Sequence, residues 1–310
     1  MSPRFPDHSR VVFIGDSITA VGLWVAHVYD HYLRAFPDAD IRMYNAGISG
    51  GSAVSALRYL DDNGLNYRPT HAVIMLGMND VDRDGYRVNE DGEYTNKDVS
   101  RWQAALEKYE AGMRELAGRL LEKGISLTFV SPTCLDESTA PRTINMIGCD
   151  AALEFAGEIT RRLAEELHSP FISMHAPFRL MNAARPVINE DRVHPSEAGY
   201  FLMSRIFLAA QGLIPEPTLT SLSDLPTQAL LPENQARYKA EQVIRDLWNA
   251  EWLIFQNVPH DIAAREETIR TYPYNSPYIN GLIAVWREHA QKKDVADQLE
   301  LDLTEACVKK

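Results

Sequence analysis

Three side chains suited to nucleophilic acyl transfer follow short apolar runs in this sequence. Ser17 comes after the first run, and Asp191 and His194 come after the last. A serine hydroxyl is a weak nucleophile unless a base lies beside it, and an imidazole that titrates near neutral pH is the best match. An aspartate three residues before that histidine, on a turn into a helix, can accept the Nδ1–H and fix the tautomer. These residue types therefore suit attack by a serine on a carbonyl carbon.

The elements that must position these residues alternate between short β-branched runs and longer helical patterns over the first 215 residues. This alternation indicates strand-helix-strand units and a parallel sheet covered on both faces. The predicted strands are Arg10–Gly15, Asp40–Tyr44, His71–Leu76, Ser126–Ser131 and Pro170–Met174. The predicted helices are Ala20–Phe36, Gly51–Leu60, Ser100–Lys123, Cys149–Leu167 and Pro195–Gln211. The expected fold class is α/β, a doubly wound three-layer α/β/α sandwich with a five-stranded parallel sheet.

Polar and glycine-rich segments follow four of these strands. In an open parallel sheet, ligands bind beyond the carboxyl ends of the strands, so these segments are expected to meet. They are residues 15–19 (Gly-Asp-Ser-Ile-Thr), 45–51 (Asn-Ala-Gly-Ile-Ser-Gly-Gly), 77–80 (Gly-Met-Asn-Asp) and 191–195 (Asp-Arg-Val-His-Pro). In this order the four blocks resemble those of the SGNH (GDSL-type) esterases and lipases, and the resemblance covers roughly residues 10 to 211.

The resemblance implies a role for each of five residues. Ser17 would be the nucleophile, His194 its base, and Asp191 the residue that orients the histidine. The backbone N–H groups of Ser17 and Gly50 and the side-chain amide of Asn79 would form the oxyanion hole. The resemblance also implies a flavodoxin-like SGNH hydrolase fold and ester hydrolysis through an acyl-enzyme intermediate, with no metal or organic cofactor.

The same residues also have purely structural interpretations. Ser17 could be the N-cap of the first helix, and Gly50 and Asn79 could belong to tight turns. Asp191 and His194 could be solvated loop residues. Their shared place at strand ends favours the hydrolytic site, because the structural interpretations do not explain that coincidence.

A second serine competes as the nucleophile. Residues 47–51 (Gly-Ile-Ser-Gly-Gly) fit the Gly-x-Ser-x-Gly elbow of α/β-hydrolases, with Ser49 at its centre. Such an elbow normally follows several strands and an oxyanion loop, whereas one predicted strand besides its own precedes it here. Ser17 is therefore favoured over Ser49.

An acidic segment resembles a calcium loop. Residues 80–85 (Asp-Val-Asp-Arg-Asp-Gly) match the opening of an EF-hand, with Asp91 at its twelfth position. An aspartate in place of the usual glutamate, the positive charge of Arg87 and a preceding strand argue against calcium binding. A solvated acidic loop is the favoured interpretation.

Charge and cysteine content exclude other classes of protein. The 31 Lys and Arg against 43 Asp and Glu give a net charge of −12, which disfavours nucleic acid and anionic membranes as partners. Cys134, Cys149 and Cys307 are odd in number and lack CxxC spacing, so neither a disulfide framework nor a zinc site is implied. The N-terminal residues show no secretory pattern, and the predicted location is the cytoplasm.

The sequence predicts a hydrolase domain over residues 1–215 and a linker with a helical extension over 216–310. Two helices are expected there, from apolar residues at helical spacing: Ala240, Ile244, Trp248, Trp252 and Phe255, then Ile279, Leu282 and Trp286. Packing on the main domain, a homo-oligomer interface and a lid over the cleft all remain open.

The expected substrate is a small ester, with a short acyl group such as acetyl on a polar or carbohydrate alcohol. The segments Val81–Asn96 and Leu135–Ile147 should line the cleft, and they are polar rather than apolar. Their charged residues include Arg83, Arg87, Asp136, Glu137 and Arg142. Trp24 is either a sugar-stacking platform or a core residue. The alternatives are a lysophospholipase or thioesterase, an acyltransferase, or a non-catalytic binding protein.

Overall fold

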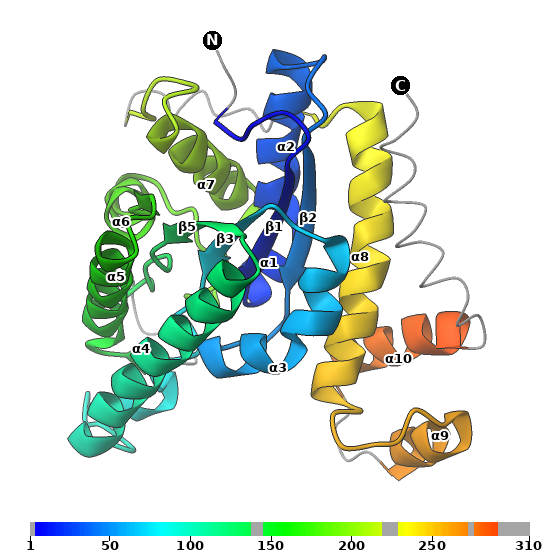
Figure 1. The fold of residues 1–310 in the computed structure, drawn as a ribbon. Helices are drawn as coiled ribbons and strands as arrows, with labels where there is room; N and C mark the ends of the chain where they lie inside the picture. The colour runs from blue at the N-terminus through cyan, green and yellow to red at the C-terminus, as the bar shows by residue number, and fades with distance from the viewer. Residues whose placement is uncertain (1–3, 138–144, 219–228, 272–275, 291–310) are drawn as a thin grey trace.

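A parallel five-stranded sheet forms the centre of the molecule (Figure 1). The computed structural model describes residues 4–137, 145–218, 229–271 and 276–290. The strands lie in the order β2-β1-β3-β5-β7. They span Arg42–Gly47 (β2), Arg10–Gly15 (β1), His71–Met75 (β3), Ser126–Val130 (β5) and Phe171–Ile172 (β7). Helices on both faces make the α/β/α sandwich that the sequence predicts, which confirms the fold class.

The sheet is apolar on both faces because helices cover both. Val11, Val12 and Phe13 of β1, and Val73 and Ile74 of β3, are fully buried. β1 pairs with β2 on one side and with β3 on the other. The chain therefore changes direction across the sheet at β1, and the loops that follow β1 and β3 diverge at their carboxyl ends. That divergence opens the position where a ligand can bind.

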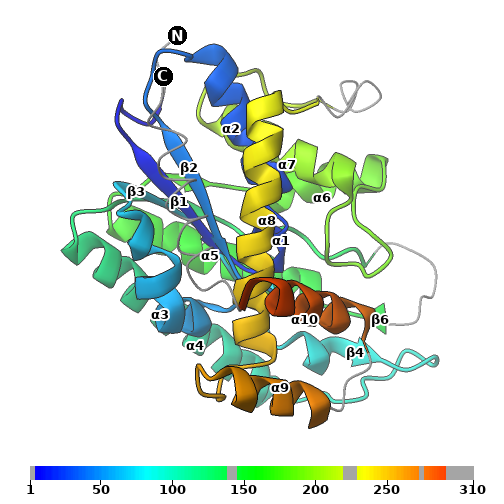
Figure 2. The same cartoon turned by 90° about the vertical axis from the view of Figure 1, so that its right-hand side faces the viewer.

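Two groups of helices flank the sheet (Figure 2). Three of them pack side by side on one face: α3 (Ala53–Asn63), α4 (Val99–Glu122) and α5 (Cys149–Glu166). On the other face α2 (Leu23–Ala35) packs against α7 (Glu197–Ala210). Within the residues that the structure describes, no helix combines the length and apolar character needed to cross a membrane.

The helical segment after β1 differs from the predicted single helix over Ala20–Phe36. A short helix, α1 (Ser17–Ala20), ends before Gly22, and α2 starts at Leu23. Gly22 has φ +74°, and a Cβ there would lie 2.8 Å from the side-chain nitrogens of Asn45 and Gln242. The prediction was wrong because helical periodicity does not register a left-handed glycine.

Trp24 is a core residue, so its interpretation as a sugar-stacking platform is wrong. Its indole is fully buried and meets the rings of Phe13 and Phe207 edge-on, with centroids 5.2 and 5.7 Å away. Edge-to-face packing of this kind stabilises an aromatic core.

Several further elements depart from the sequence prediction. β2 begins and ends later than the predicted Asp40–Tyr44, and β7 is shorter than Pro170–Met174. The helices α6 (His175–Ala184) and α9 (Ile262–Thr271) were not predicted. Nor were the small pair β4 (Arg87–Val88) and β6 (Asn145–Met146), or the 3₁₀ turns η1 (Leu65–Tyr67) and η2 (Arg83–Tyr86). Short elements carry too few residues to show a periodicity.

The C-terminal extension packs on the main domain. Its long helix α8 (Pro232–Leu253) runs along β2, and α10 (Pro277–Ala290) crosses near the end of α8 (Figures 1 and 2). The two helices share a small core of Ala250, Ile254, Phe255, Leu282, Ile283 and Trp286. Much of the predicted linker, residues 219–228, lies outside the described residues.

Charged side chains of α8 bind the open edge of β2. An edge strand presents backbone N–H and C=O groups that no neighbouring strand takes up. Three of them are bonded to α8: Met43 O accepts from Arg237 Nη1 (2.7 Å), Asn45 N–H donates to Glu241 Oε1 (2.7 Å), and Gly47 O accepts from Arg245 Nη1 (3.2 Å). The helix thus takes the place of a sixth strand.

Candidate active site

Ser17, His194 and Asp191 form one hydrogen-bonded chain. Ser17 Oγ lies 2.8 Å from His194 Nε2, and His194 Nδ1 lies 2.6 Å from Asp191 Oδ2. Ser17 is the first residue of α1, directly after β1, whereas the other two residues precede α7. The structure therefore brings together three side chains from two loops 177 residues apart.

The turn that carries Asp191 and His194 is fixed by its own backbone. Asp191 Oδ1 accepts the N–H groups of Val193 (3.0 Å) and His194 (2.9 Å). Arg192, which follows Asp191, has φ +69° and a buried side chain that donates to the carbonyl oxygen of Asp136 (2.7 Å). The aspartate thus orients the imidazole through both the ring and the main chain.

The Asp191 carboxylate is ionised across the neutral range. Burial alone would raise its pKa, but the hydrogen bonds from the His194 ring and from the N–H groups of His194 and Val193 outweigh burial and lower the pKa to about 2. A carboxylate at Nδ1 favours the tautomer that carries its proton there. Nε2 is then the acceptor that faces Ser17 Oγ–H.

Asp16 caps the helix that begins with Ser17. Its Oδ1 accepts the N–H of Ile18 (2.9 Å), and burial raises the pKa of this carboxyl to about 6. The interpretation of Ser17 as the N-cap is therefore wrong. Because Asp16 does the capping, the Ser17 hydroxyl stays free to meet His194.

The loop after β2 lies directly against the Ser17 loop. Ile48 N–H donates to Gly15 O (3.1 Å), and a Cβ on Gly51 would lie 3.5 Å from Asp16 Cα and 2.7 Å from Ile48 O. Gly50 adopts φ +74°. Glycine at both positions lets the two loops approach closely.

Two backbone donors belong to this junction. In the described part of the chain, the N–H groups of Ser17 and Gly50 donate to no other protein group. One belongs to the first residue of a helix and the other to a turn of left-handed conformation. Unpaired donors of this kind are suited to bind negative charge.

The Asn79 amide is oriented at both ends. Its Nδ2 donates to Gly51 O (2.9 Å), and its Oδ1 accepts from Arg83 Nη2 (2.8 Å). This pairing excludes the flipped amide, because Arg83 can only donate. The second Nδ2–H remains available for a ligand.

Asp80 is buried beside these groups. Its Oδ1 accepts the N–H of Ala53 at the start of α3 (2.9 Å), and its Oδ2 is buried without a hydrogen bond among the described residues. Burial, helped by the charge of Asp16, raises the pKa of Asp80 to about 7. Asp80 supports the loop after β2 through Ala53.

The other carboxylates of the calcium-like segment are paired with arginines. Asp82 bonds to Arg101 (2.7 Å) and Asp84 to Arg87 (2.8 Å), and η2 begins directly after Asp82 and includes Asp84. In the described ranges, no three His, Cys, Asp or Glu residues gather to hold a metal ion. The ion pairs favour the interpretation of an acidic surface loop.

Ser49 faces the C-terminal extension. Its Oγ lies 3.1 Å from the Tyr278 hydroxyl, and its N–H donates to Asn249 Oδ1 (2.9 Å). The competing nucleophile is thus bonded to α8 and α10, whereas Ser17 is bonded to a histidine.

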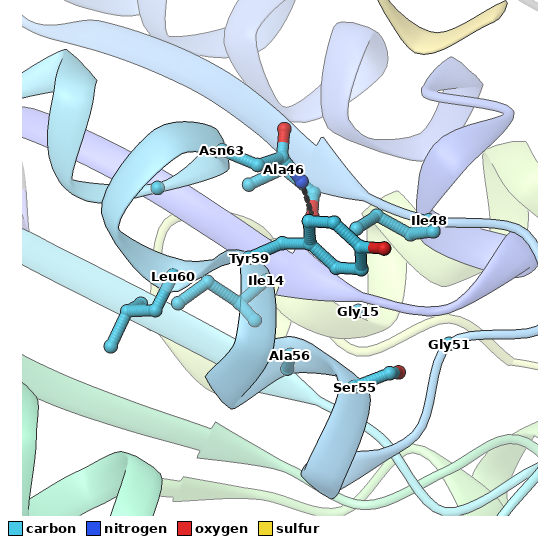
Figure 3. Close-up of a pocket in the computed structure, with 11 residues that line it drawn as sticks. Ile14, Gly15, Ala46, Ile48, Gly51, Ser55, Ala56, Tyr59, Leu60 and Asn63 are labelled. Carbon is cyan, nitrogen blue, oxygen red and sulfur yellow. Dashed lines mark hydrogen bonds between the residues drawn. The ribbon is translucent and has the colours of Figure 1, made fainter. Parts of the chain in front are cut away.

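A small pocket lies between the Ile48–Gly51 loop and α3 (Figure 3). Tyr59 of α3 projects into it, and its ring meets the indoles of Trp248 and Trp252 edge-on at 5.8 and 5.7 Å. The pocket is lined by Ile14, Gly15, Ala46, Ile48, Gly51, Ser55, Ala56, Tyr59, Leu60, Asn63 and Gly64. Of the loop residues, Ile48 and Gly51 line this pocket, whereas Ser49 and Gly50 do not.

The remaining predicted lining residues are partly structural. Glu137 Oε1 accepts the N–H of Asp150 (2.8 Å), and Arg142 lies outside the described residues.

The cysteines offer no alternative nucleophile among the described residues, and Cys307 lies outside them. Cys134 and Cys149 are buried, and burial raises the pKa of the Cys149 thiol to about 12. A thiol so buried and protonated is not a nucleophile at neutral pH.

Sequence reasoning missed two kinds of site residue. Asp16 and Asp80 stand next to Ser17 and Asn79, so the blocks themselves contained the signal. Arg83 was predicted to line the cleft, but its bond to Asn79 was not predicted. Asn249 and Tyr278 carry no such signal, because they lie on helices about 200 residues further along the chain.

A hydrolase is the class that the structure indicates, through its fold, the junction of its loops and the hydrogen-bonded chain from Ser17 to Asp191. Residues 13–202 match the model of the GDSL-like lipase/acylhydrolase family, and the chain belongs to this family. It is a carboxylic ester hydrolase with the SGNH fold.

Comparison of the sequence and of the structure identifies individual proteins that are similar to this chain. The acetylxylan esterase of Geobacillus stearothermophilus is 28% identical over 225 residues, which cover 66% of this chain and 94% of that one. The crystal structure of acetylxylan esterase Axe2 from the same organism superposes with a TM-score of 0.55 at 24% identity, over 68% of this chain and 97% of that chain.

A second structural match includes the extension. A gut microbial diltiazem-metabolizing enzyme superposes with a TM-score of 0.78 at 16% identity, over 99% of this chain and 96% of that chain. At this identity the match establishes a common fold, and the coverage includes the C-terminal helices.

Proposed function

We propose that this esterase hydrolyses short-chain esters, acetyl esters above all, with Ser17 as the nucleophile. The observation that carries the proposal is the hydrogen-bonded chain from Ser17 through His194 to Asp191, at 2.8 and 2.6 Å. A serine hydroxyl paired with an oriented imidazole is the arrangement that acyl transfer requires.

The reaction proceeds in two displacements. Ser17 Oγ attacks the acyl carbon while its proton moves to His194 Nε2, and Asp191 stabilises the imidazolium. The imidazolium returns the proton to the departing alcohol, which leaves an ester between Ser17 and the acyl group. Water then attacks this acyl-enzyme with Nε2 as base, and the acid is released.

The negative charge on the acyl oxygen is met by three donors. They are the N–H groups of Ser17 and Gly50 and the second Nδ2–H of Asn79. Donors held in place before the reaction stabilise this charge without reorganisation, which makes them a large contribution to catalysis. Arg83 adds a positive charge at the far end of the Asn79 amide.

Acetyl groups on a polar alcohol are the proposed substrates. The relative from Geobacillus stearothermophilus is an acetylxylan esterase. The segment that follows Asn79 carries charged residues such as Arg83, Asp84 and Arg87, which suit a hydroxyl-rich alcohol better than a long alkyl chain.

The test compares three proteins on p-nitrophenyl acetate, butyrate and octanoate, and on acetylated xylo-oligosaccharides. Ser17→Ala is expected to lower kcat by about 10⁴-fold or more, because the nucleophile is lost. Ser49→Ala, the matched control in the neighbouring loop, should retain at least roughly a tenth of the activity, since it loses one hydrogen bond to Tyr278.

The reverse outcome, with Ser49→Ala inactive and Ser17→Ala active, would overturn the assignment of the nucleophile. Higher turnover on octanoate than on acetate would overturn the proposed acyl group. Wild-type protein that is inert with water but active with added alcohol acceptors would indicate an acyltransferase.

A further inference from the structure

The C-terminal extension bonds to the loop that carries Gly50. Asn249 on α8 accepts the N–H of Ser49 through Oδ1 at 2.9 Å. Tyr278 on α10 places its hydroxyl 3.1 Å from Ser49 Oγ and also interacts with the side chain of Asn249. Asn249 is only 4% exposed, so this network lies between the extension and the main domain.

The two ends of the loop are held differently from its middle. Ile48 N–H donates to Gly15 O, and Gly51 N–H donates to Ile48 O, so both ends are bonded within the domain. The polar groups of Ser49, in between, are bonded to α8 and α10. Gly50, at φ +74°, has no side chain that could fix its peptide.

Packing around Gly50 also comes from the extension. The nearest atom to a Cβ built on Gly50 is Trp252 Nε1, at 3.5 Å. On the inner side the loop borders the small pocket formed with α3 (Figure 3). Ile48 and Gly51 line this pocket, whereas Ser49 and Gly50 do not, so the contacts that hold the Ser49–Gly50 peptide come from α8 and α10.

We propose that the extension completes the active site, with Asn249 and, more weakly, Tyr278 as positioning residues for the Gly50 N–H. Hydrogen bonds at the Ser49 N–H and Oγ restrict rotation at Ser49, which would otherwise turn the next N–H away from the acyl oxygen. Neither residue needs to touch the substrate. The inference rests on the proposed function, in which Gly50 N–H binds the developing negative charge.

The test compares two buried asparagines of α8. Asn249 bonds to the Gly50 loop, whereas Asn234 is 1% exposed and donates from Nδ2 to Ala26 O (2.8 Å) in α2. Asn249→Ala and Asn234→Ala should both lower Tm, because Asn249 loses its bond to Ser49 and Asn234 loses its bonds to Ala26 O and to Asp30 Oδ1 (3.3 Å). Their kinetics should differ.

Asn249→Ala is expected to lower kcat on p-nitrophenyl acetate by roughly 10- to 100-fold with KM changed by less than about threefold, since a misplaced donor weakens binding of the transition state. Asn234→Ala should keep kcat within about twofold. Equal losses of kcat in the two variants, or a change in Asn249→Ala confined to KM, would overturn the inference.

A milder variant keeps the test valid if Asn249→Ala does not fold. Tyr278→Phe removes one hydroxyl from a half-exposed ring, and it should lower kcat by about two- to fivefold. Ser49→Ala removes the same hydrogen bond from the other side, so the double variant should be no slower than the worse single variant. Additive losses, or an unchanged kcat in Tyr278→Phe, would contradict the inference.

Wild-type protein and Ser17→Ala are measured alongside. An inactive wild type or an active Ser17→Ala would refute the proposed function itself. An active wild type with an inactive Ser17→Ala, together with normal kcat in Asn249→Ala, would refute only the role of the extension.

Discussion

The two proposed donors Asn79 and Gly50 are supported in opposite ways. Asn79 is held by Arg83, four residues further along, and by Gly51, 28 residues earlier, both within the sheet domain. Gly50 is held through Ser49 by Asn249, which lies 200 residues from Ser49 on a helix outside the sandwich.

This difference separates local support of a donor from support by a distant segment of the chain. The Asn79 support is local, because Gly51 belongs to one of the four loop blocks and Arg83 lies three residues beyond another. The Gly50 support exists only where α8 and α10 dock. In the proposed role of the extension, a segment that contributes no reacting group tunes the active site.

The largest effect in this comparison is expected when the Asn79 side chain is removed. Asn79→Ala should lower kcat by about 10²–10³-fold, the usual effect of losing one oxyanion donor. Arg83→Ala should lower it by only about tenfold, because Gly51 O still holds the amide. The measurement is kcat on p-nitrophenyl acetate.

The double variant provides the control for that prediction. Because Arg83 is expected to act through Asn79, Asn79→Ala with Arg83→Ala should be no slower than Asn79→Ala alone. Multiplied losses would show that Arg83 acts on the substrate directly.

An intermediate effect is expected at the docking surface of α8. Glu241→Ala leaves the buried Asn45 N–H without its acceptor, so the free energy of unfolding should fall by about 1–3 kcal/mol. Glu241→Gln keeps an acceptor and should cost less. Denaturant unfolding gives both values, and equal losses would show that the hydrogen bond is not the cause.

A pH-dependent effect is expected at Asp80, which supports the Gly50 loop from within the domain through Ala53. Its pKa is raised to about 7, chiefly by burial, whereas an unfolded aspartate titrates near 3.9. Between these values the folded protein holds a proton that the unfolded chain has lost. This contribution makes the folded state less stable as the pH rises from about 4 to 7.

Asp80→Asn removes this titration and keeps an acceptor for Ala53. The free energy of unfolding of the variant, relative to wild type, should therefore increase with pH across that window. Denaturant unfolding at pH 4, 5, 6 and 7 measures the trend, and a constant difference would contradict it.

The sheet was largely predictable because its strands are continuous apolar runs. β1 coincides with the predicted Arg10–Gly15, and β3 and β5 end within a residue of the prediction. The break at Gly22 was not predictable from periodicity, because it depends on the side chains of Asn45 and Gln242 that fill the space beside the glycine.

The part of the site that could be predicted is the part carried by local motifs. Ser17 and Asn79 each follow a strand within a few residues, so position along the chain implied position in space. His194 lies well beyond β7, with α6 between them, and it was selected through its spacing from Asp191. Asn249 stands one turn from Trp252 in a helix whose apolar stripe was recognised. Helical periodicity shows which face is buried but not which loop that face meets, so its partner Ser49 could not be inferred.

The hydrogen bonds between α8 and β2 also depend on how well the residue spacings of the helix and the strand match. Arg237, Glu241 and Arg245 stand four residues apart, and four helical residues rise about 6 Å. The backbone groups that they bind recur every two strand residues, or about 6.6 Å. The spacings along the helix and along the strand therefore nearly match over this span. The side-chain charges run positive, negative, positive, and they face a backbone carbonyl, an N–H and a carbonyl in the same order. A slip of the helix by one turn would set guanidinium against N–H and carboxylate against C=O, so these charges determine the register in which the extension docks.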